Sequence, residues 1–137
     1  MKVKYEVQPQ NYSDLVGELI IAKVDNQDAG KTGYVSCNRG MYVYNGLNNA
    51  LMKMILYSPP DIIVEQPMRE KGIGMGLLDR LLDQLVARSF DNLIISLPDG
   101  EKKFYNKALG KLAKKGKIAS VHYDFAFQLG PVLEVRI

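Results

Sequence analysis

The sequence predicts a mixed α+β domain, and three of its segments carry that prediction. Residues 61–97 run from a short apolar stretch through an amphipathic segment to a second apolar stretch, the pattern of a strand–helix–strand unit. Residues 121–137 alternate apolar and polar side chains on both sides of Gly130-Pro131, as the arms of an antiparallel hairpin do. Residues 18–37 hold two more strand-like runs around a polar turn. We therefore expect a central mixed, mostly antiparallel sheet that ends in a C-terminal β-hairpin.

The N-terminal half is expected to supply antiparallel strands. Val3, Tyr5 and Val7 alternate with charged residues, and Pro9 ends that run. The other elements expected in this half are a short helical turn at 11–17, strands at 18–24 and 32–37 around a turn at 25–31, a strand at 41–44 and a helix at 48–56.

The C-terminal half has the clearer periodicity. Buried strands are expected at 61–65 and 93–97, and strands joined through a helix normally run parallel with a right-handed crossover. The helix between them, 72–89, turns one apolar stripe toward the core: Ile73, Leu77, Leu78, Leu81, Leu82, Leu85 and Val86. A second helix is expected to begin at Asp99 and to end near Gly116. The terminal hairpin is expected to bury one face, formed by Val121, Tyr123, Phe125, Phe127, Leu129, Leu133, Val135 and Ile137.

Length and composition indicate one globular domain, 1–137, because no repeat or long linker divides the 137 residues. Hydrophobic residues make up 47% and charged residues 24% of the chain, as in proteins with an ordinary core. Cys37 is the single cysteine, which excludes an internal disulfide and favours a reducing compartment. No signal-like segment is present, and no apolar run approaches the ~20 residues of a membrane span. We expect a cytoplasmic protein without a membrane partner.

The net charge of +3 is small, but the positive charge is unevenly distributed. One stretch holds Lys102, Lys103, Lys107, Lys111, Lys114, Lys115 and Lys117. Such a stretch serves either as a solvated helix face, which we favour, or as a surface for a polyanion such as RNA. A small RNA-binding domain is therefore an alternative, although the sequence lacks the exposed aromatic platform that such domains use.

The loop between the first buried strand and its helix has the composition of an anion site. Arg69 and Lys71 are followed by Gly72, Gly74 and Gly76, directly before the helix. A helix N-terminus offers unpaired N–H groups and a partial positive charge, and glycines let the backbone close on a phosphate. The competing interpretation is a glycine-rich turn that only packs helix against strand.

The loop is not a P-loop, which needs Gly-Lys-Ser/Thr. A dinucleotide fingerprint is an open alternative, since Asp99 lies about where its ribose-binding acid would be. Its third glycine comes one residue early, and Arg69, Lys71 and the antiparallel end of the chain weaken this interpretation.

The hexapeptide Arg69-Glu70-Lys71-Gly72-Ile73-Gly74 matches the R/Q-x-x-G-x-G/A signature of the GNAT N-acetyltransferases. The surrounding order resembles that family as well: 21–36 is similar to its central hairpin, and Phe104-Tyr105-Asn106-Lys107 to the start of its second motif. The resemblance implies a GNAT-like sheet with a strand–loop–helix–strand unit that binds acyl-CoA. Glu70 stands where the family usually has a small residue, and Tyr105 lies five residues before Gly110 where four is usual.

The resemblance also assigns the cofactor contacts. In that family the strand before the loop is splayed from its neighbour, and its backbone pairs with pantetheine; here these residues would be Ile63, Val64 and Glu65. Arg69 would add positive charge near the pyrophosphate of acetyl-CoA. The backbone amides that would hold this pyrophosphate are those of Glu70, Lys71, Gly72, Ile73, Gly74 and Met75. No metal is expected in the site.

Two residues are candidates for the chemistry. Tyr105 matches the family's tyrosine that protonates the departing thiolate, although a packing aromatic is an equally good interpretation. Glu65 ends the strand beside the expected thioester and could deprotonate an ammonium group, directly or through water. A solvated carboxylate at a strand end is the interpretation that we favour for Glu65.

These features predict transfer of an acetyl group from acetyl-CoA to a primary amine by direct attack. The alternative is a non-catalytic acyl-CoA-binding module that regulates or scaffolds a partner. The sequence does not identify the acceptor, which could be a small amine, an antibiotic, a peptide N-terminus, a lysine or an aminoacyl-tRNA. tRNA is the one nucleic acid that the predicted activity would involve. The terminal hairpin could also pair across a homodimer.

Overall fold

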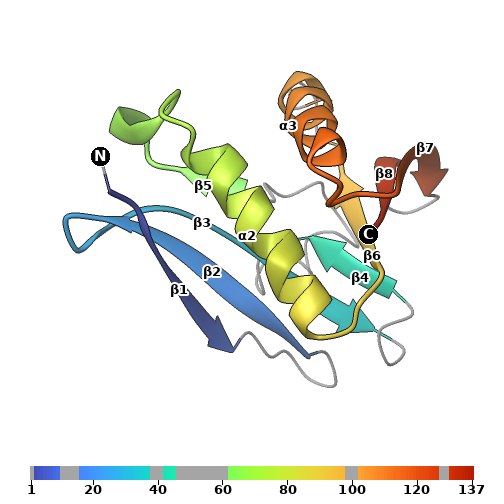
Figure 1. The fold of residues 1–137 in the computed structure, drawn as a ribbon, viewed down its shortest axis with the longest axis horizontal. Helices are drawn as coiled ribbons and strands as arrows, with labels where there is room; N and C mark the ends of the chain where they lie inside the picture. Colours follow the sequence, from blue (N-terminus) through green and yellow to red (C-terminus); the bar gives the residue numbers. More distant parts are fainter. Residues whose placement is uncertain (1, 10–15, 38–41, 46–61, 98–101, 127–129) are drawn as a thin grey trace.

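The computed structural model describes residues 2–9, 16–37, 42–45, 62–97, 102–126 and 130–137, and they form one sheet with two helices (Figure 1). The strands are β1 (Lys4–Pro9), β2 (Val16–Val24), β3 (Gln27–Cys37), β4 (Tyr42–Asn45), β5 (Ile62–Val64), β6 (Asn92–Ser96), β7 (Ser120–Ala126) and β8 (Gly130–Arg136). The helices are α2 (Ile73–Ala87) and α3 (Lys102–Lys114), and a 3-10 turn, Gln66–Met68, follows β5.

The described strands form an eight-stranded sheet in the order β1-β2-β3-β4-β6-β8-β7, with β5 paired to β3 beside that path. Every pairing is antiparallel except that of β4 with β6. This confirms the predicted α+β class, the mostly antiparallel mixed sheet and the C-terminal hairpin. Residues of both helices share a single core with alternate residues of β6 and β8, so the two helices cover the same face of the sheet.

The strands β4 and β5 lie in line along β3. Asn45 at the end of β4 is opposite Tyr34 of β3. Ile62 at the start of β5 is opposite Thr32, which is two residues nearer the start of β3. Of these two strands, only β4 pairs with β6, through Tyr44 and Ile94. The sequence predicted that the strand at 61–65 would be buried and would run beside 93–97. The structure corrects both points, because β4 makes the parallel pairing and the side chains of β5 are half-buried.

The hairpin of β2 and β3 turns on two residues. Asp25 and Asn26 both have left-handed backbone, with φ of 53° and 64°, which is the geometry of a type I′ turn. The predicted turn at 25–31 was therefore too long, since β3 begins at Gln27 despite its polar and glycine residues. Pairing with β2 outweighs the weak strand propensity of those residues.

Other expectations of the N-terminal half have mixed outcomes. The helical turn predicted at 11–17 is wrong at its end, because Val16 and Gly17 belong to β2. Its first part, the helix at 48–56 and the cap at Asp99 lie outside the described residues. The predicted strand at 41–44 is found as β4.

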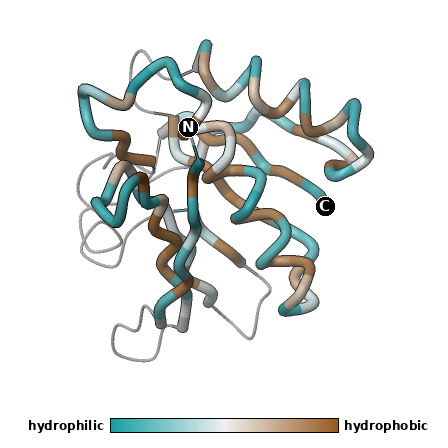
Figure 2. The backbone as a smooth tube through the Cα atoms, turned by 60° about the vertical axis from the view of Figure 1, so that its left-hand side comes forward, coloured by the Kyte–Doolittle hydropathy of each residue, from teal (hydrophilic) through white to brown (hydrophobic). Residues whose placement is uncertain are grey.

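The core lies between the sheet and the two helices. Hydrophobic residues recur along both helices, as expected for helices that each bury one face (Figure 2). The predicted stripe of α2 is buried apart from Val86, which is 58% exposed. The buried residues of α3 are Tyr105, Ala108, Leu109 and Leu112. Within the described part of the chain, no helix is both long and apolar enough to cross a membrane.

Among the described side chains of the terminal hairpin, those predicted to be buried are buried on β8 and exposed on β7. The predicted members Phe125, Phe127 and Leu129 lie outside the described side chains. Val135 and Leu133 of β8 are 1% and 4% exposed. Their direct partners on β7, Val121 and Tyr123, are 42% and 53% exposed. Since β7 is the outermost strand on that side of the sheet, it extends past the cover that the helices give to β8.

A buried carboxylate joins β2 to the last turn of α2. Glu18 accepts two hydrogen bonds from Arg88, at 3.0 and 3.1 Å, two from the amide of Gln84, both at 3.0 Å, and one from the Tyr34 hydroxyl at 2.5 Å. Burial raises the pKa of Glu18, but these hydrogen bonds and the charge of Arg88 lower it by more, so the net pKa is below the usual value. Burial, together with the neighbouring carboxylate, raises the pKa of Tyr34.

Candidate functional site

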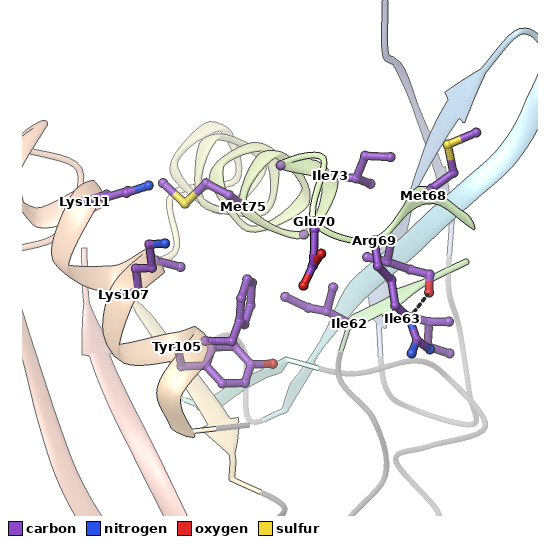
Figure 3. Close-up of a pocket in the computed structure, with 15 residues that line it drawn as sticks. Ile62, Ile63, Met68, Arg69, Glu70, Ile73, Met75, Tyr105, Lys107 and Lys111 are labelled. Atoms are coloured by element: carbon purple, nitrogen blue, oxygen red, sulfur yellow. Dashed lines mark hydrogen bonds between the residues drawn. The ribbon is translucent and has the colours of Figure 1, made fainter. Parts of the chain in front are cut away.

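A cavity of about 990 Å³ opens between β5, the loop after it, the first turn of α2 and one side of α3 (Figure 3). Pockets for a small molecule or a cofactor typically have volumes of ~300–1,000 Å³, and this cavity lies near the top of that range. The residues that line it are Ile62, Ile63, Val64, Met68, Arg69, Glu70, Gly72, Ile73, Gly74, Met75, Phe104, Tyr105, Lys107, Ala108 and Lys111.

The N-terminus of α2 is open toward this cavity. Gly72 is the N-cap with φ of 81°, and no side chain caps the helix. The first turn closes with a hydrogen bond from the Gly76 N–H to the Gly72 carbonyl, 3.0 Å long. The amides of Ile73, Gly74 and Met75 therefore precede the first helical hydrogen bond, and they carry the positive end of the helix dipole. This geometry suits a bound anion.

The three glycines of the loop have different structural roles. A Cβ on Gly72 would meet nothing within 4 Å, so this glycine serves the left-handed backbone and keeps the approach open. A Cβ on Gly74 would lie 3.2 Å from the ring of Phe104, and one on Gly76 would lie 2.1 Å from the Tyr5 hydroxyl. Gly74 and Gly76 therefore have the packing role, while Gly72 keeps the approach to the helix N-terminus open, as the predicted phosphate cradle would need.

The strand β5 presents an open backbone edge to the cavity. The Glu65 N–H donates to the Ala29 carbonyl at 2.8 Å, which makes this an antiparallel hydrogen-bonded pair. By strand alternation, the backbone of Ile63 also faces β3, whereas the N–H and C=O groups of Ile62 and Val64 face away from it. The Val64 carbonyl accepts a hydrogen bond from Arg69 Nε at 3.1 Å.

Charged residues enter the cavity from two sides. On the loop side, Arg69 lies beside β5, and Glu70 projects its carboxylate into the cavity from a backbone with φ of 63° (Figure 3). Lys107 and Lys111 extend from α3 on the opposite wall (Figure 3). Lys71 is exposed and is not part of the lining.

Solved structures share this arrangement of strands and helices. An acetyltransferase from Bacillus subtilis, in complex with CoA, superposes with a TM-score of 0.58 at 15% identity, over 99% of this chain and 98% of that one. GCN5 of Tetrahymena gives a TM-score of 0.59 at 12% identity, over 88% of this chain and 68% of that one. An acetyltransferase of the GNAT family from Staphylococcus aureus gives 0.55 at 12% identity, over 88% and 67%.

The chain has the GNAT fold. The fold that the hexapeptide and its surroundings predicted is thereby confirmed. The sequence itself matches no protein-family model and no curated protein. Identities of 12–15% show the shared fold and leave activity to be argued from the site.

Of the two residues predicted for chemistry, this GNAT fold brings only Tyr105 to the cavity. Tyr105 is 1% exposed and lines the cavity, with its ring edge-on to Phe104 at 5.2 Å between centroids. The side chain of Glu65 is exposed and lies outside the lining. Within the described residues, Glu70 is the one carboxylate that lines the cavity, and no group of three or more His, Cys, Asp or Glu could hold a metal.

Six lining residues were not among the predicted contacts: Ile62, Met68, Phe104, Lys107, Ala108 and Lys111. Helical spacing could have found Lys107 and Lys111, because they are one turn apart on the helix that carries Tyr105. Ile62 follows from the pairing register of β5, which the sequence alone does not specify. Met68 carries no sequence signal of a contact.

Proposed function

We propose that this protein is an N-acetyltransferase that moves the acetyl group of acetyl-CoA to a primary amine. The observation that carries this proposal is that one cavity joins the uncapped N-terminus of α2 to the edge of β5 that pairs with no described strand. A strand edge pairs with the amide groups of pantetheine, and a helix N-terminus holds a pyrophosphate. The GNAT fold supports the same assignment by analogy.

The cofactor lies along the loop side of the cavity in this proposal. The pyrophosphate binds the amides between Glu70 and Met75, which include those of Lys71, Gly72, Ile73 and Gly74. Arg69 adds positive charge beside it. Pantetheine pairs with the backbone of β5, where the register favours Ile62 and Val64, while Ile63 contributes its side chain and Glu65 stands at the strand end.

The reaction is a direct attack on the thioester. The neutral amine attacks the carbonyl carbon, and an N–H of the β5 edge stabilises the oxyanion that forms. The C–S bond then breaks, and the thiolate takes a proton from the Tyr105 hydroxyl. The nitrogen of the new amide gives up its extra proton, through water, to the tyrosinate, which restores Tyr105. The acceptor first loses its ammonium proton to water or, through water, to Glu65, since Glu65 does not reach the cavity. We place this reaction in the cytoplasm, where the lone Cys37 would stay reduced.

Thermal unfolding with added ligand tests the binding step. Acetyl-CoA at 100 times its dissociation constant should raise the free energy of unfolding by about 2.7 kcal/mol. NAD and ATP serve as controls with different phosphate chemistry. A melting temperature that moves with NAD or ATP but not with acetyl-CoA at millimolar concentration would reject the assignment. Release of free CoA with a panel of amines then tests catalysis.

A non-catalytic module that binds acyl-CoA is the second candidate. One observation favours it. The residue that the sequence suggested as the general base, Glu65, is not part of the described lining of the cavity. Tight binding of acetyl-CoA without turnover on small amines, peptides, lysine or aminoacyl-tRNA would support this candidate. A homodimer paired through the terminal hairpin remains compatible with either candidate.

A further inference from the structure

The lysines of α3 fall into two sets, and only one set faces the cavity. Lys107 and Lys111 line the cavity, whereas Lys103 and Lys114 are exposed and are not part of its lining. The spacing of four residues puts the lining pair on one face of the helix, a turn apart. By the same spacing, Lys103 and Lys114 flank this pair along the helix, so the cavity takes in only the middle two of these four lysines.

The lining pair has no carboxylate partner within the described part of the chain. Lys117, by contrast, pairs with both Asp79 and Asp83 of α2. Among the described residues, neither Lys107 nor Lys111 forms an ion pair. Two ammonium groups one turn apart repel each other by a few tenths of a kcal/mol, so an anion between them would relieve the repulsion. The pair therefore has the charge and the position of an anion subsite.

The subsite is separate from the anion site at the α2 N-terminus. Arg69 and the first amides of α2 form one side of the cavity, and Lys107 and Lys111 project from the helix on the other (Figure 3). Glu70 projects its carboxylate into the cavity from the loop before α2 (Figure 3). A cavity with two cationic walls fits a ligand that carries two separate phosphate groups.

We propose that Lys107 and Lys111 bind the ribose 3′-phosphate of CoA and so select CoA over dephospho-CoA. This inference rests on the proposed function, which provides the pyrophosphate that the α2 side would hold. A phosphate monoester has a second pKa near 6 and is therefore largely a dianion at pH 7, unlike each phosphate of the pyrophosphate. A dianion matches two ammonium groups, and each lysine contributes a charge-assisted hydrogen bond.

The test compares CoA with dephospho-CoA by calorimetry at low salt. The wild-type protein should bind CoA about 10- to 100-fold more tightly, the range expected for one or two charge-assisted hydrogen bonds. The variant Lys107→Ala/Lys111→Ala should weaken CoA to the level of dephospho-CoA and leave dephospho-CoA unchanged. The matched control, Lys103→Ala/Lys114→Ala, removes the same charge from the same helix and should keep the preference. Lys107→Arg/Lys111→Arg should keep it as well.

Each other outcome separates the two proposals. Equal affinity of the wild type for both ligands, or an unchanged preference in the Lys107→Ala/Lys111→Ala variant, overturns the inference and leaves the proposed function standing. Equal weakening of both ligands by that variant also overturns it, because the lysines would then serve the pyrophosphate. If the wild type binds neither ligand, the proposed function fails and the inference fails with it. Melting curves of all variants confirm that the fold is retained, as expected for exposed lysines.

Discussion

At the scale of single residues, Tyr105 is at once a core residue and a wall of the cavity. Its ring is 1% exposed and packs edge-on against Phe104, and it lines the cavity beside β5. From the sequence, a general acid and a packing aromatic are equally good interpretations of this position. The structure shows the packing role, while the catalytic role remains a prediction.

Replacement of Tyr105 by phenylalanine separates the two roles. The ring stays, so the free energy of unfolding and the affinity for acetyl-CoA should change little. Loss of a general acid typically lowers a rate by about 10²–10⁴, and a thiol with a pKa near 8.5 tolerates the loss better than most leaving groups. We expect kcat to fall by about 10² with a responsive amine, since the lost interaction exists only in the transition state. Unchanged kcat would leave Tyr105 with packing alone.

Two glycines in open space give a matched test of backbone conformation. A Cβ on Gly72 or on Gly110 would touch nothing within 4 Å, so neither substitution creates a clash. Gly72 has φ of 81°, and an alanine there should cost roughly 1–2 kcal/mol of stability. Gly110 lies within α3, where alanine should add about 0.5–1 kcal/mol. Chemical denaturation of Gly72→Ala and Gly110→Ala should therefore give shifts of opposite sign, and shifts of the same sign would contradict the left-handed cap.

At the scale of elements, the open edge of β5 depends on how two strands share β3. Because β4 and β5 lie in line, β4 alone pairs with β6, and the backbone of Ile62 and Val64 is left facing the cavity. The sequence predicted the existence of the strand at 61–65 from its apolar residues and flanking prolines. It did not predict which strand would meet β6, since apolar patterning fixes which face is buried and leaves strand neighbours undetermined.

The terminal hairpin allows a second matched comparison. Val135 and Val121 are directly opposite each other on β8 and β7, but they are 1% and 42% exposed. Val135→Ala removes two buried carbon groups, at about 0.8 kcal/mol each, and leaves a cavity as well. We expect a loss of at least about 1.5 kcal/mol for Val135→Ala and about 0.5 kcal/mol for Val121→Ala, by urea unfolding. Equal losses would mean that β7 is covered in solution.

At the scale of the whole molecule, one core beneath two helices holds the sheet together, and the cavity lies where β5 departs from it. The sequence predicted α2, β6 and the anion loop because each carries its own local signal: helical periodicity, an apolar run and glycines before a helix. It missed Lys107 and Lys111 as lining residues: helical spacing places them one turn apart on α3, but it does not show that this face of α3 is turned toward the cavity. It also overestimated the burial of Val86 and Tyr123, because periodicity shows which side chains share a face and gives no information on how far the cover extends.

Glu18 links the two layers of the molecule, and its ionisation should make the stability depend on pH. Its folded-state pKa lies below the usual 4.5, so the carboxylate stabilises the fold fully above about pH 4.5, and that stabilisation is lost as the pH falls through the folded value. At pH 7, Glu18→Gln should cost about 1.5–3 kcal/mol, the range for hydrogen bonds to a charged group.

The difference in unfolding free energy between wild type and Glu18→Gln should therefore narrow from pH 7 to pH 3, because the other carboxylates titrate alike in both proteins. The control is Asp28→Asn, whose carboxylate is 3.7 Å from Lys23 on the surface. Such an exposed pair contributes about 0–1 kcal/mol, so this variant should stay close to wild type at both pH values. A Glu18→Gln difference that is constant from pH 7 to pH 3 would mean that shape and hydrogen bonding, rather than the charge of Glu18, hold α2 to β2.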